Sequence, residues 1–221
     1  MIILVLGGSG SGKSEFAENY IIRENKYGTC YYLATMMAGE DEETKNRIER
    51  HRKLRKDKGF VTVEQAFDIE KCICRIKPET AVLLEDLSNL LANEMFARED
   101  RKAFEENKGD FDEKGLEGNC KSGKEYPVTE RIEEGISKLN NHCGLLLIVS
   151  NNIFEDGIEY DDTTKEYIRS LAGLNKDIAA VADEVWEVVC GIPVPHKDEK
   201  KTQNETWVSA ADGIYKTTSV V

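Results

Sequence analysis

A glycine-rich octapeptide near the start of the chain constrains the fold more than any other feature. Residues 7–14 read GGSGSGKS and match the pattern G-x-x-x-x-G-K-[ST] at every fixed position. An apolar run, Ile2–Leu6, comes immediately before this loop, and an amphipathic helical pattern, Ser14–Arg23, begins at its end. A buried strand, a phosphate-binding loop and a helix in this order are typical of a parallel α/β fold.

The composition of the loop explains how it would bind a nucleotide. Glycines let the backbone curl so that its N–H groups point at phosphate oxygens, and the N-terminus of the following helix adds partial positive charge. We expect Lys13, also a candidate catalytic residue, to reach the β- and γ-phosphates, and the Ser14 hydroxyl to complete the shell of Mg²⁺. The predicted nucleotide-binding residues of the loop are Gly7, Gly8, Ser9, Gly10, Ser11, Gly12, Lys13 and Ser14.

Apolar runs and helical patterns alternate along the rest of the chain. Further strands are expected at 29–34, 60–63, 81–84, 144–149 and 185–189. Further helices are expected at 41–58, 67–76, 87–96, 129–140 and 163–182. Continuous apolar strands separated by helices indicate the α/β class, with a mostly parallel sheet covered by helices on both faces.

The chain divides into one nucleotide-binding domain and a short extension. We expect the domain to span residues 1–194, with a charged, glycine-containing insertion at about 98–127 that looks like a solvated surface excursion. Residues 195–221 form the C-terminal extension. The sequence leaves open whether this tail is an extra edge strand, a contact with a neighbouring subunit or a loose segment.

Composition argues against several classes of protein. The 42 acidic residues exceed the 30 basic ones, and the net charge of −12 opposes binding to nucleic acid or to an anionic membrane. No apolar stretch approaches the roughly 20 residues of a membrane span, and the opening run lacks a signal peptide's basic leader. The six cysteines lack metal-site spacing, so we expect reduced thiols in the cytoplasm, with Cys72 and Cys74 packed on the helix at 67–76.

Two adjacent carboxylates follow the strand at 81–84. In phosphate-loop proteins, an acidic residue at the C-terminal end of a strand holds Mg²⁺ or its water. Alternation along the strand points Leu84 and Glu85 to opposite sides. Either carboxylate fits the metal, and Asp86 also fits the N-cap of the helix beginning at Leu87. We favour Glu85 as the residue for the nucleotide or the metal, and Asp86 as the cap.

A basic segment, residues 41–58, carries one of the three histidines. Arg47 and Arg55 lie four residues to either side of His51, on the same face of the expected helix. Nearby cations favour a neutral, nucleophilic imidazole, and arginines can hold a triphosphate, so His51 is a candidate nucleophile toward an α-phosphate. The same spacing is typical of a solvated helix with pairs such as Glu43–Arg47, and spacing alone favours that alternative.

Taken in order, segments of this chain resemble the bifunctional adenosylcobinamide kinase / adenosylcobinamide-phosphate guanylyltransferase family. The resemblance covers most of residues 1–193. It is carried by ILVLGGSGSGKS, YYLATM, RIERHRKLR, FVTVE, LLEDLSNLLAN, LIVSNN and IRSLAGLNKDIAAVADEVWEVVCGIP. The phosphate loop alone is generic, whereas the run RI-x-x-HR together with the closing segment is much more specific.

The resemblance implies a RecA-like P-loop NTPase fold, a homotrimer and two reactions that use Mg²⁺. In the first, ATP or GTP phosphorylates the hydroxyl on the aminopropanol arm of adenosylcobinamide. In the second, GMP passes from GTP to that phosphate through a histidine–GMP intermediate, and His51 stands at the guanylylated position. The implied nucleotide contacts beyond the loop are Ala34, Thr35, Met36, Arg52, Lys53, Leu54, Arg55, Glu64 and Glu85.

The chain departs from the family pattern mainly after Asn151. Asn152 stands where the family has Glu, Ser170 and Lys176 replace an acidic residue and Gln, and Phe60 replaces Trp. These changes cluster where a corrinoid substrate would be expected, so they bear on the acceptor more than on the nucleotide. Two alternatives are a P-loop small-molecule kinase without guanylyl transfer and a non-catalytic nucleotide-binding regulatory protein.

Overall fold

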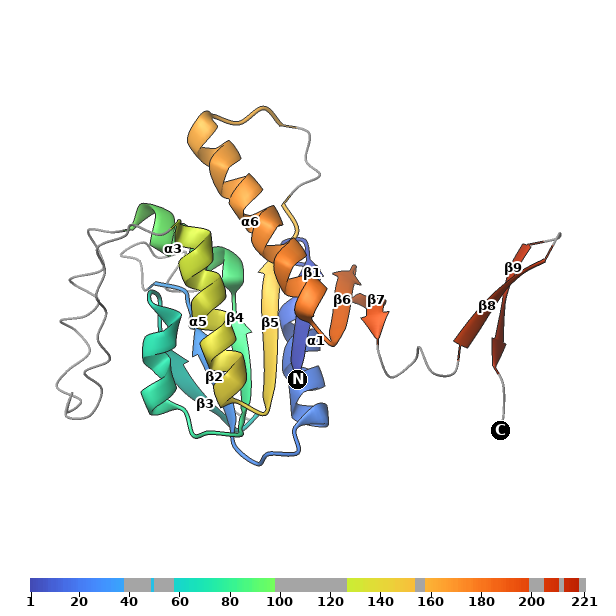
Figure 1. Ribbon diagram of the computed structural model, residues 1–221, viewed down its shortest axis with the longest axis horizontal. Coiled ribbons are helices and arrows are strands. Elements are labelled where there is room, and N and C mark those ends of the chain that lie inside the picture. The colour runs from blue at the N-terminus through green and yellow to red at the C-terminus, as the bar shows by residue number, and fades with distance from the viewer. Residues whose placement is uncertain are drawn as a thin grey trace.

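The computed structural model describes residues 1–37, 49, 58–97, 127–153, 158–198, 205–210 and 213–218. Its body is a seven-stranded sheet in the order β3-β2-β4-β5-β1-β6-β7 (Figure 1). The parallel strands are β1 (Ile2–Gly7), β2 (Cys30–Ala34), β3 (Phe60–Glu64), β4 (Ala81–Glu85), β5 (Leu145–Asn151) and β6 (Glu184–Val189). The antiparallel strand is β7 (Ile192–Asp198). The predicted mostly parallel α/β sheet is confirmed.

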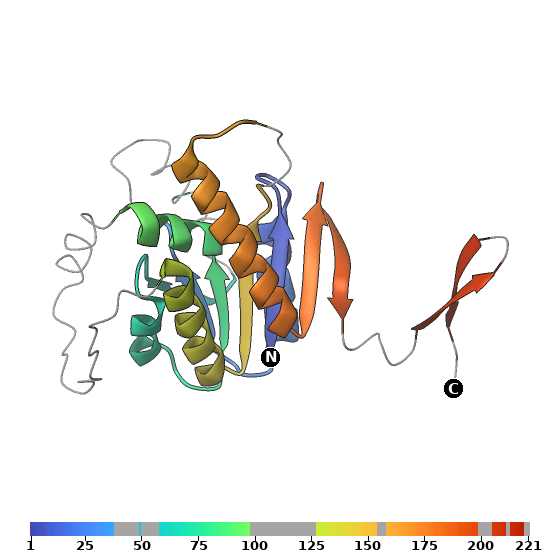
Figure 2. The same cartoon turned by 45° about the horizontal axis from the view of Figure 1, so that its top comes forward.

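Helices cover both faces of this sheet (Figure 2). One face carries α1 (Lys13–Glu24). The other carries the 3-10 helix η1 (Ile69–Arg75), α3 (Leu87–Phe96), α5 (Val128–His142) and α6 (Asp162–Val181). The arrangement follows from strands that are apolar on both sides, because each side must be removed from water.

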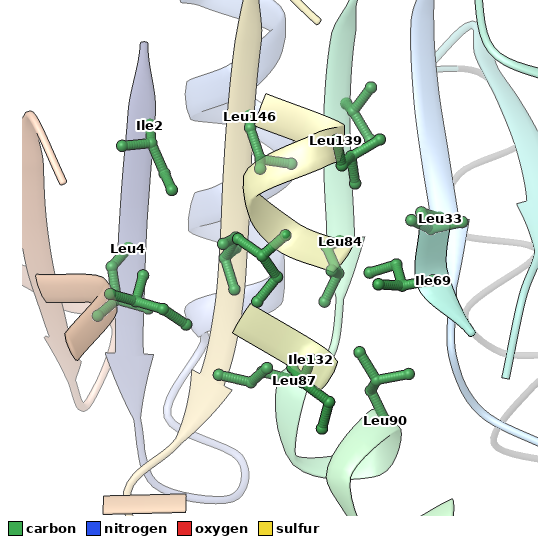
Figure 3. Close-up of a cluster of buried hydrophobic side chains, with 14 of the residues drawn as sticks. Ile2, Leu4, Leu33, Ile69, Leu84, Leu87, Leu90, Ile132, Leu139 and Leu146 are labelled. Carbon is green, nitrogen blue, oxygen red and sulfur yellow. The ribbon is translucent and has the colours of Figure 1, made fainter. Parts of the chain in front are cut away.

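Alternation within the strands builds two separate hydrophobic cores. In β1, Ile2 and Leu4 face the layer of α3, α5 and α6, whereas Ile3 and Val5 face α1. Figure 3 shows the larger core, in which strand residues such as Leu84 lie against helix residues that include Leu139. Burial of these side chains, many of them fully inaccessible to water, is the main term that stabilises the sheet and so fixes the positions of its strand ends.

The segment expected as a helix at 67–76 forms the 3-10 helix η1, and its two cysteines differ. Cys72 is buried in the core, but Cys74 is exposed, so the prediction that both pack was wrong for Cys74. A 3-10 helix has about three residues per turn, so residues two apart point about 120° away from each other, and only one side of η1 faces the core. Cys190 is exposed as well, whereas Cys30 and Cys143 are buried. Burial raises the pKa of the Cys30, Cys72 and Cys143 thiols to about 12, which keeps these thiols protonated.

Several sequence predictions fall outside the described residues. Of the helix expected at 41–58, the structure describes Glu49, which is helical, and Lys58. The candidate nucleophile His51 and the segment 52–55 lie outside, as does the insertion expected at about 98–127, except for Pro127. None of the described helices has the length and the apolar composition that a membrane span requires.

The C-terminal part begins as an edge strand. Residues 194 and 195, where the predicted domain meets the predicted extension, both lie in β7. This strand pairs with β6 so that Val188 opposes Pro193 and Trp186 opposes Pro195. Beyond it, β8 (Glu205–Ala210) and β9 (Gly213–Thr218) form a separate antiparallel hairpin.

Candidate nucleotide-binding site

The phosphate loop lies between β1 and α1 and has a backbone that only glycine tolerates well. Gly10 and Gly12 have φ values of 70° and 90°, in the left-handed region that side chains disfavour. A Cβ on Gly7 would lie 2.5 Å from the Ser11 Oγ and 2.8 Å from the Val188 carbonyl oxygen, both closer than van der Waals contact allows. The loop therefore needs Gly10 and Gly12 for their conformation and Gly7 for space.

The lysine of the loop is folded back over the backbone. Lys13 is 7% exposed, and its Nζ donates a hydrogen bond to the Gly8 carbonyl oxygen at 3.1 Å. Gly12 is the N-cap of α1 and has no side chain, so the first amides of this helix receive no side-chain cap. A cationic side chain beside the uncapped N-terminus of a helix is an arrangement that binds phosphate oxygens.

The carboxylate predicted to serve the metal lies beside the loop. The Ser14 Oγ donates a hydrogen bond of 2.5 Å to the Glu85 Oε1. The Glu85 Oε2 is buried and makes no hydrogen bond within the part of the chain that the structure describes. Burial, reinforced by the neighbouring Asp86 charge, raises the pKa of Glu85 to about 8, although the Ser14 hydrogen bond and the Lys13 charge act in the opposite direction.

These two side chains fit a magnesium ion. A hydroxyl and a carboxylate are the hard oxygen ligands that Mg²⁺ takes in nucleotide sites, where phosphate oxygens and water complete the shell. A cation at this place would also meet the buried Glu85 oxygen that forms no hydrogen bond among the described residues. It would favour the ionised form of this carboxyl, which burial alone disfavours.

Asp86 caps the following helix, as expected. Its side chain accepts a hydrogen bond from the Asn89 amide at 2.7 Å and another from the Ser88 hydroxyl at 2.7 Å. Leu84 lies in the core that α3 helps to build, whereas Glu85 reaches Ser14 on the α1 side. The alternation predicted at the end of β4 is therefore confirmed, and the two adjacent carboxylates make separate contacts.

Residues from β2 and β3 meet Glu85 at the same edge of the sheet. In the strand register, Ala34 is paired with Glu64 on one side and with Glu85 on the other. Thr35 is fully buried, and its Oγ1 donates to the Asp86 carbonyl oxygen at 2.7 Å and accepts from the Asp86 amide at 2.8 Å. Met36 follows as a partly buried residue. The Thr35 side chain thus joins β2 to the chain beyond β4.

Sequence reasoning did not assign Asn151 to the site. It is the register partner of Gly7, and its Nδ2 donates to the Asp86 Oδ2 at 3.3 Å and to the Ser88 hydroxyl. Because β5 lies between β1 and β4, this amide sits between the phosphate loop and the pair of carboxylates. The signal in the sequence is a polar residue directly after a long apolar strand, at the edge where ligands of parallel sheets bind.

These features together define a P-loop nucleotide-binding protein: the glycine backbone of the loop, the lysine and serine at its end, and the carboxylate on a nearby parallel strand. The family model described as cobinamide kinase / cobinamide phosphate guanyltransferase matches residues 3–196. The chain belongs to this family.

Two relatives of this chain, from different bacteria, have the same name. The chain is 31% identical over 199 residues to the bifunctional adenosylcobalamin biosynthesis protein CobU of Escherichia coli, and 30% identical over 199 residues to the protein of the same name from Salmonella typhimurium. Each alignment covers 89% of this chain and all of the relative. Among solved structures, a KaiC-like protein from Pyrococcus horikoshii aligns with a TM-score of 0.44 and 12% identity, over 98% of this chain and 88% of that chain.

Proposed function

We propose that this chain phosphorylates cobinamide and then transfers GMP to the product, the two activities that the description of its family names. The observation that carries the proposal is the contact between Ser14 and Glu85 beside a complete phosphate loop. The loop would hold the phosphates of the nucleotide, and Ser14 and Glu85 would offer the metal two oxygen ligands beside them. We further propose that the enzyme works as a homotrimer in the cytoplasm, which the resemblance and the cysteine usage predict.

In the kinase step, the loop amides and Lys13 hold the polyphosphate of ATP or GTP. The hydroxyl of the aminopropanol arm attacks the γ-phosphorus and releases its proton to water, the bond from this phosphorus to the β,γ-bridging oxygen breaks, and the nucleoside diphosphate leaves. Mg²⁺, when bound by Ser14 and Glu85, would neutralise charge on the phosphates. Lys13 stabilises the charge that develops on the bridging oxygen, because its ammonium lies beside the loop.

In the guanylyl step, we assign the nucleophile to His51. Its imidazole attacks the α-phosphorus of GTP, pyrophosphate leaves, and a phosphoramidate bond joins GMP to the histidine. The phosphate of cobinamide phosphate then attacks the same phosphorus and releases the imidazole. Arg52, Lys53, Leu54 and Arg55 would complete the nucleotide site, and Ala34, Thr35, Met36 and Glu64 would line it from β2 and β3.

Labelling with GTP tests the second half of this proposal. Incubation of the protein with GTP labelled in the α-phosphate should give an acid-labile protein adduct that is lost in His51→Ala. His196→Ala is the matched control, because His196 is half-exposed and pairs with Glu187. The His196→Ala protein should still form the adduct. The absence of label on the wild type would leave a P-loop kinase without guanylyl transfer.

An assay with adenosylcobinamide tests the first half. Each triphosphate is supplied separately, and transfer of phosphate and of GMP to the corrinoid are scored as separate products. We expect both products from the wild type and only the phosphorylated corrinoid from His51→Ala. Tight nucleotide binding without turnover of the corrinoid would instead favour the non-catalytic regulatory protein.

A further inference from the structure

Helix α3 places an amide side chain between two loops at the carboxyl edge of the sheet. The Asn93 Nδ2 donates one hydrogen bond to the Thr35 carbonyl oxygen at 2.8 Å and another to the Ala66 carbonyl oxygen at 3.1 Å. An amide nitrogen carries two hydrogens, so these two bonds use its full capacity as a donor. One partly buried side chain thus joins the loop after β2 to the loop after β3.

Both loops carry residues of the proposed nucleotide site. Thr35 is the middle residue of the segment 34–36, and Ala66 comes two residues after Glu64. The loops also meet directly, since the backbone N–H of Gln65 donates to the Ala34 carbonyl oxygen at 2.9 Å. The contact from Asn93 therefore acts where the two strand ends are already close, and it fixes the direction in which the following residues leave the sheet.

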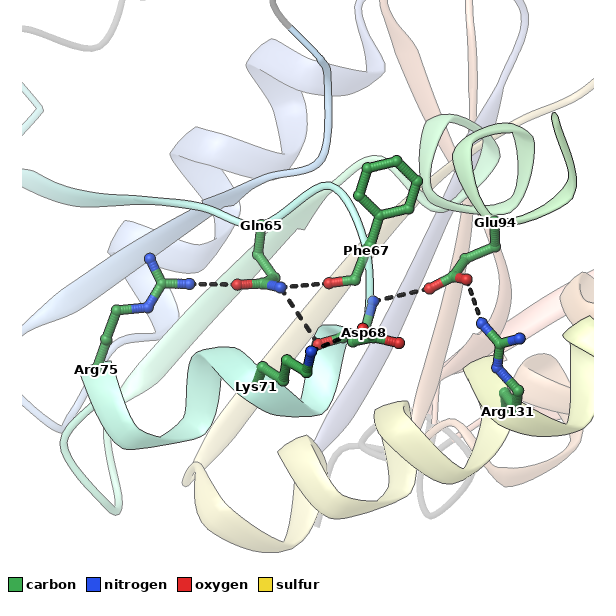
Figure 4. Close-up of polar contacts among 7 residues, drawn as sticks. All are labelled: Gln65, Phe67, Asp68, Lys71, Arg75, Glu94 and Arg131. Atoms are coloured by element: carbon green, nitrogen blue, oxygen red, sulfur yellow. Dashed lines mark hydrogen bonds and ion pairs between the residues drawn. The ribbon is translucent and has the colours of Figure 1, made fainter. Parts of the chain in front are cut away.

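The helix that carries Asn93 is itself firmly held. Asp86 caps its N-terminus, and Leu87, Leu90 and Leu91 are fully buried. Next to Asn93, the buried Glu94 accepts a hydrogen bond from the Asp68 amide at 2.7 Å and pairs with Arg131 (Figure 4). Because α3 is anchored by these other contacts, the Asn93 amide is a fixed point from which the two loops are held.

We propose that Asn93 is a positioning residue for the nucleotide. It sets the spacing between the segment 34–36 and Glu64, so that both loops present their groups to one ligand, and it does so without touching that ligand. This inference rests on the proposed function, because the role of these loops in nucleotide binding is part of that proposal. The ligand that both loops would contact is a purine nucleoside triphosphate with Mg²⁺.

The substitution Asn93→Asp gives the sharpest test. It keeps the size and shape of the side chain but replaces the NH2 group, which donates to both carbonyls, by a carboxylate oxygen. This oxygen has no hydrogen to donate, and it repels the two carbonyl oxygens. We expect the Kd for GTP with Mg²⁺, measured by titration calorimetry at pH 8, to rise about tenfold. Asn25→Asp is the matched control, because the Asn25 side chain also donates to a backbone carbonyl, that of Gly28 at 2.9 Å. Asn25 caps the C-terminus of α1, whereas the phosphate loop leads into the N-terminus of this helix. The Kd of Asn25→Asp should stay within about twofold of the wild type.

The pH dependence of Asn93→Asp separates positioning from a merely structural role. A carboxyl that faces two carbonyl oxygens has a raised pKa, and its protonated form regains one donor. The Kd of Asn93→Asp relative to the wild type should therefore improve as the pH is lowered from about 8 to about 6, and the ratio for Asn25→Asp should stay constant. Thermal unfolding of each variant shows that the protein is folded at the temperature of the titration.

Two results would overturn the inference. One is a folded Asn93→Asp protein with the Kd of the wild type, and the other is a weakened Kd whose ratio to the wild type does not change with pH. If Asn93→Asp does not fold, Asn93→Ser decides in its place, since one hydroxyl donor remains and the Kd should rise about threefold. A wild type that binds no GTP contradicts the proposed function itself, which is a separate outcome.

Discussion

The two halves of the carboxyl edge of the sheet achieve order in different ways. At the phosphate loop, the course of the chain depends on a backbone conformation that glycine permits and on local contacts, such as the bond from Lys13 to the Gly8 carbonyl. At the ends of β2, β3 and β4, order comes from side chains that bond to backbone far away in the sequence, as Thr35 does with Asp86 and Asn93 with Ala66.

The difference explains why only one half can be recognised as a motif. A local backbone conformation needs particular residues at fixed spacing, so it leaves a pattern in the sequence. A network of long-range hydrogen bonds needs only that a donor and an acceptor meet after folding, and many spacings satisfy this condition. The comparison also predicts that the two halves will respond differently to substitution.

The largest effect expected of a single substitution is at the loop. In Gly7→Ala, the added methyl group would lie 2.5 Å from the Ser11 Oγ and 2.8 Å from the Val188 carbonyl oxygen. We expect a loss of about 3 kcal/mol in the free energy of unfolding, measured with urea, together with loss of detectable nucleotide binding. The control is Gly173→Ala in α6, where nothing lies within 4 Å of the new Cβ. It should be neutral or stabilising by up to about 1 kcal/mol.

A smaller effect is expected where β2 meets β4. Thr35→Val keeps the shape of the side chain but removes the hydroxyl that bonds to both the amide and the carbonyl of Asp86, and leaves the amide without this buried acceptor. The free energy of unfolding should fall by about 2 kcal/mol. Thr62→Val, on the exposed part of β3, should leave it within about 0.5 kcal/mol of the wild type. Equal values for the two variants would remove the distinction between the halves of the edge.

The third effect is a dependence on pH that originates at Glu85. The unfolded chain releases the proton of this carboxyl near pH 4.5, whereas burial raises the folded pKa to about 8. Between these values the folded protein holds more protons than the unfolded chain, so stability falls as the pH rises, by no more than about 1.4 kcal/mol per pH unit. Unfolding with urea from pH 5 to pH 8, without metal, should show this slope in the wild type and a smaller slope in Glu85→Gln. Equal slopes would contradict the assignment.

Much of the fold was predictable because its signals are strong and repeated. The apolar runs at the six parallel strands and the alternation that separates Leu84 from Glu85 led to the sheet, and the cap at Asp86 followed from residue type and position. The exposed Cys74 was not predicted, because a short 3-10 helix packs one side only and the periodicity of seven residues is too brief to locate that side.

The candidate site divides in the same manner. The phosphate loop and Glu85 are legible from motif and strand position, and Ala34 and Glu64 came from the family resemblance. Asn93 and Asn151 were missed, because each is a polar residue in an otherwise ordinary helix or strand end and gains its meaning only from the neighbours that folding provides. An asparagine in mid-helix, one position before a buried glutamate, is a weak signal that sequence alone does not distinguish from a surface residue.

The last strand of the sheet has a consequence for how copies of this protein meet. Proline has no N–H group, and β7 contains Pro193 and Pro195 among its seven residues. An extended segment from another molecule that approached this border would find fewer donors than a regular strand offers. The sheet therefore resists being lengthened from this side into a continuous stack of molecules, although the border is apolar at Ile192 and Val194.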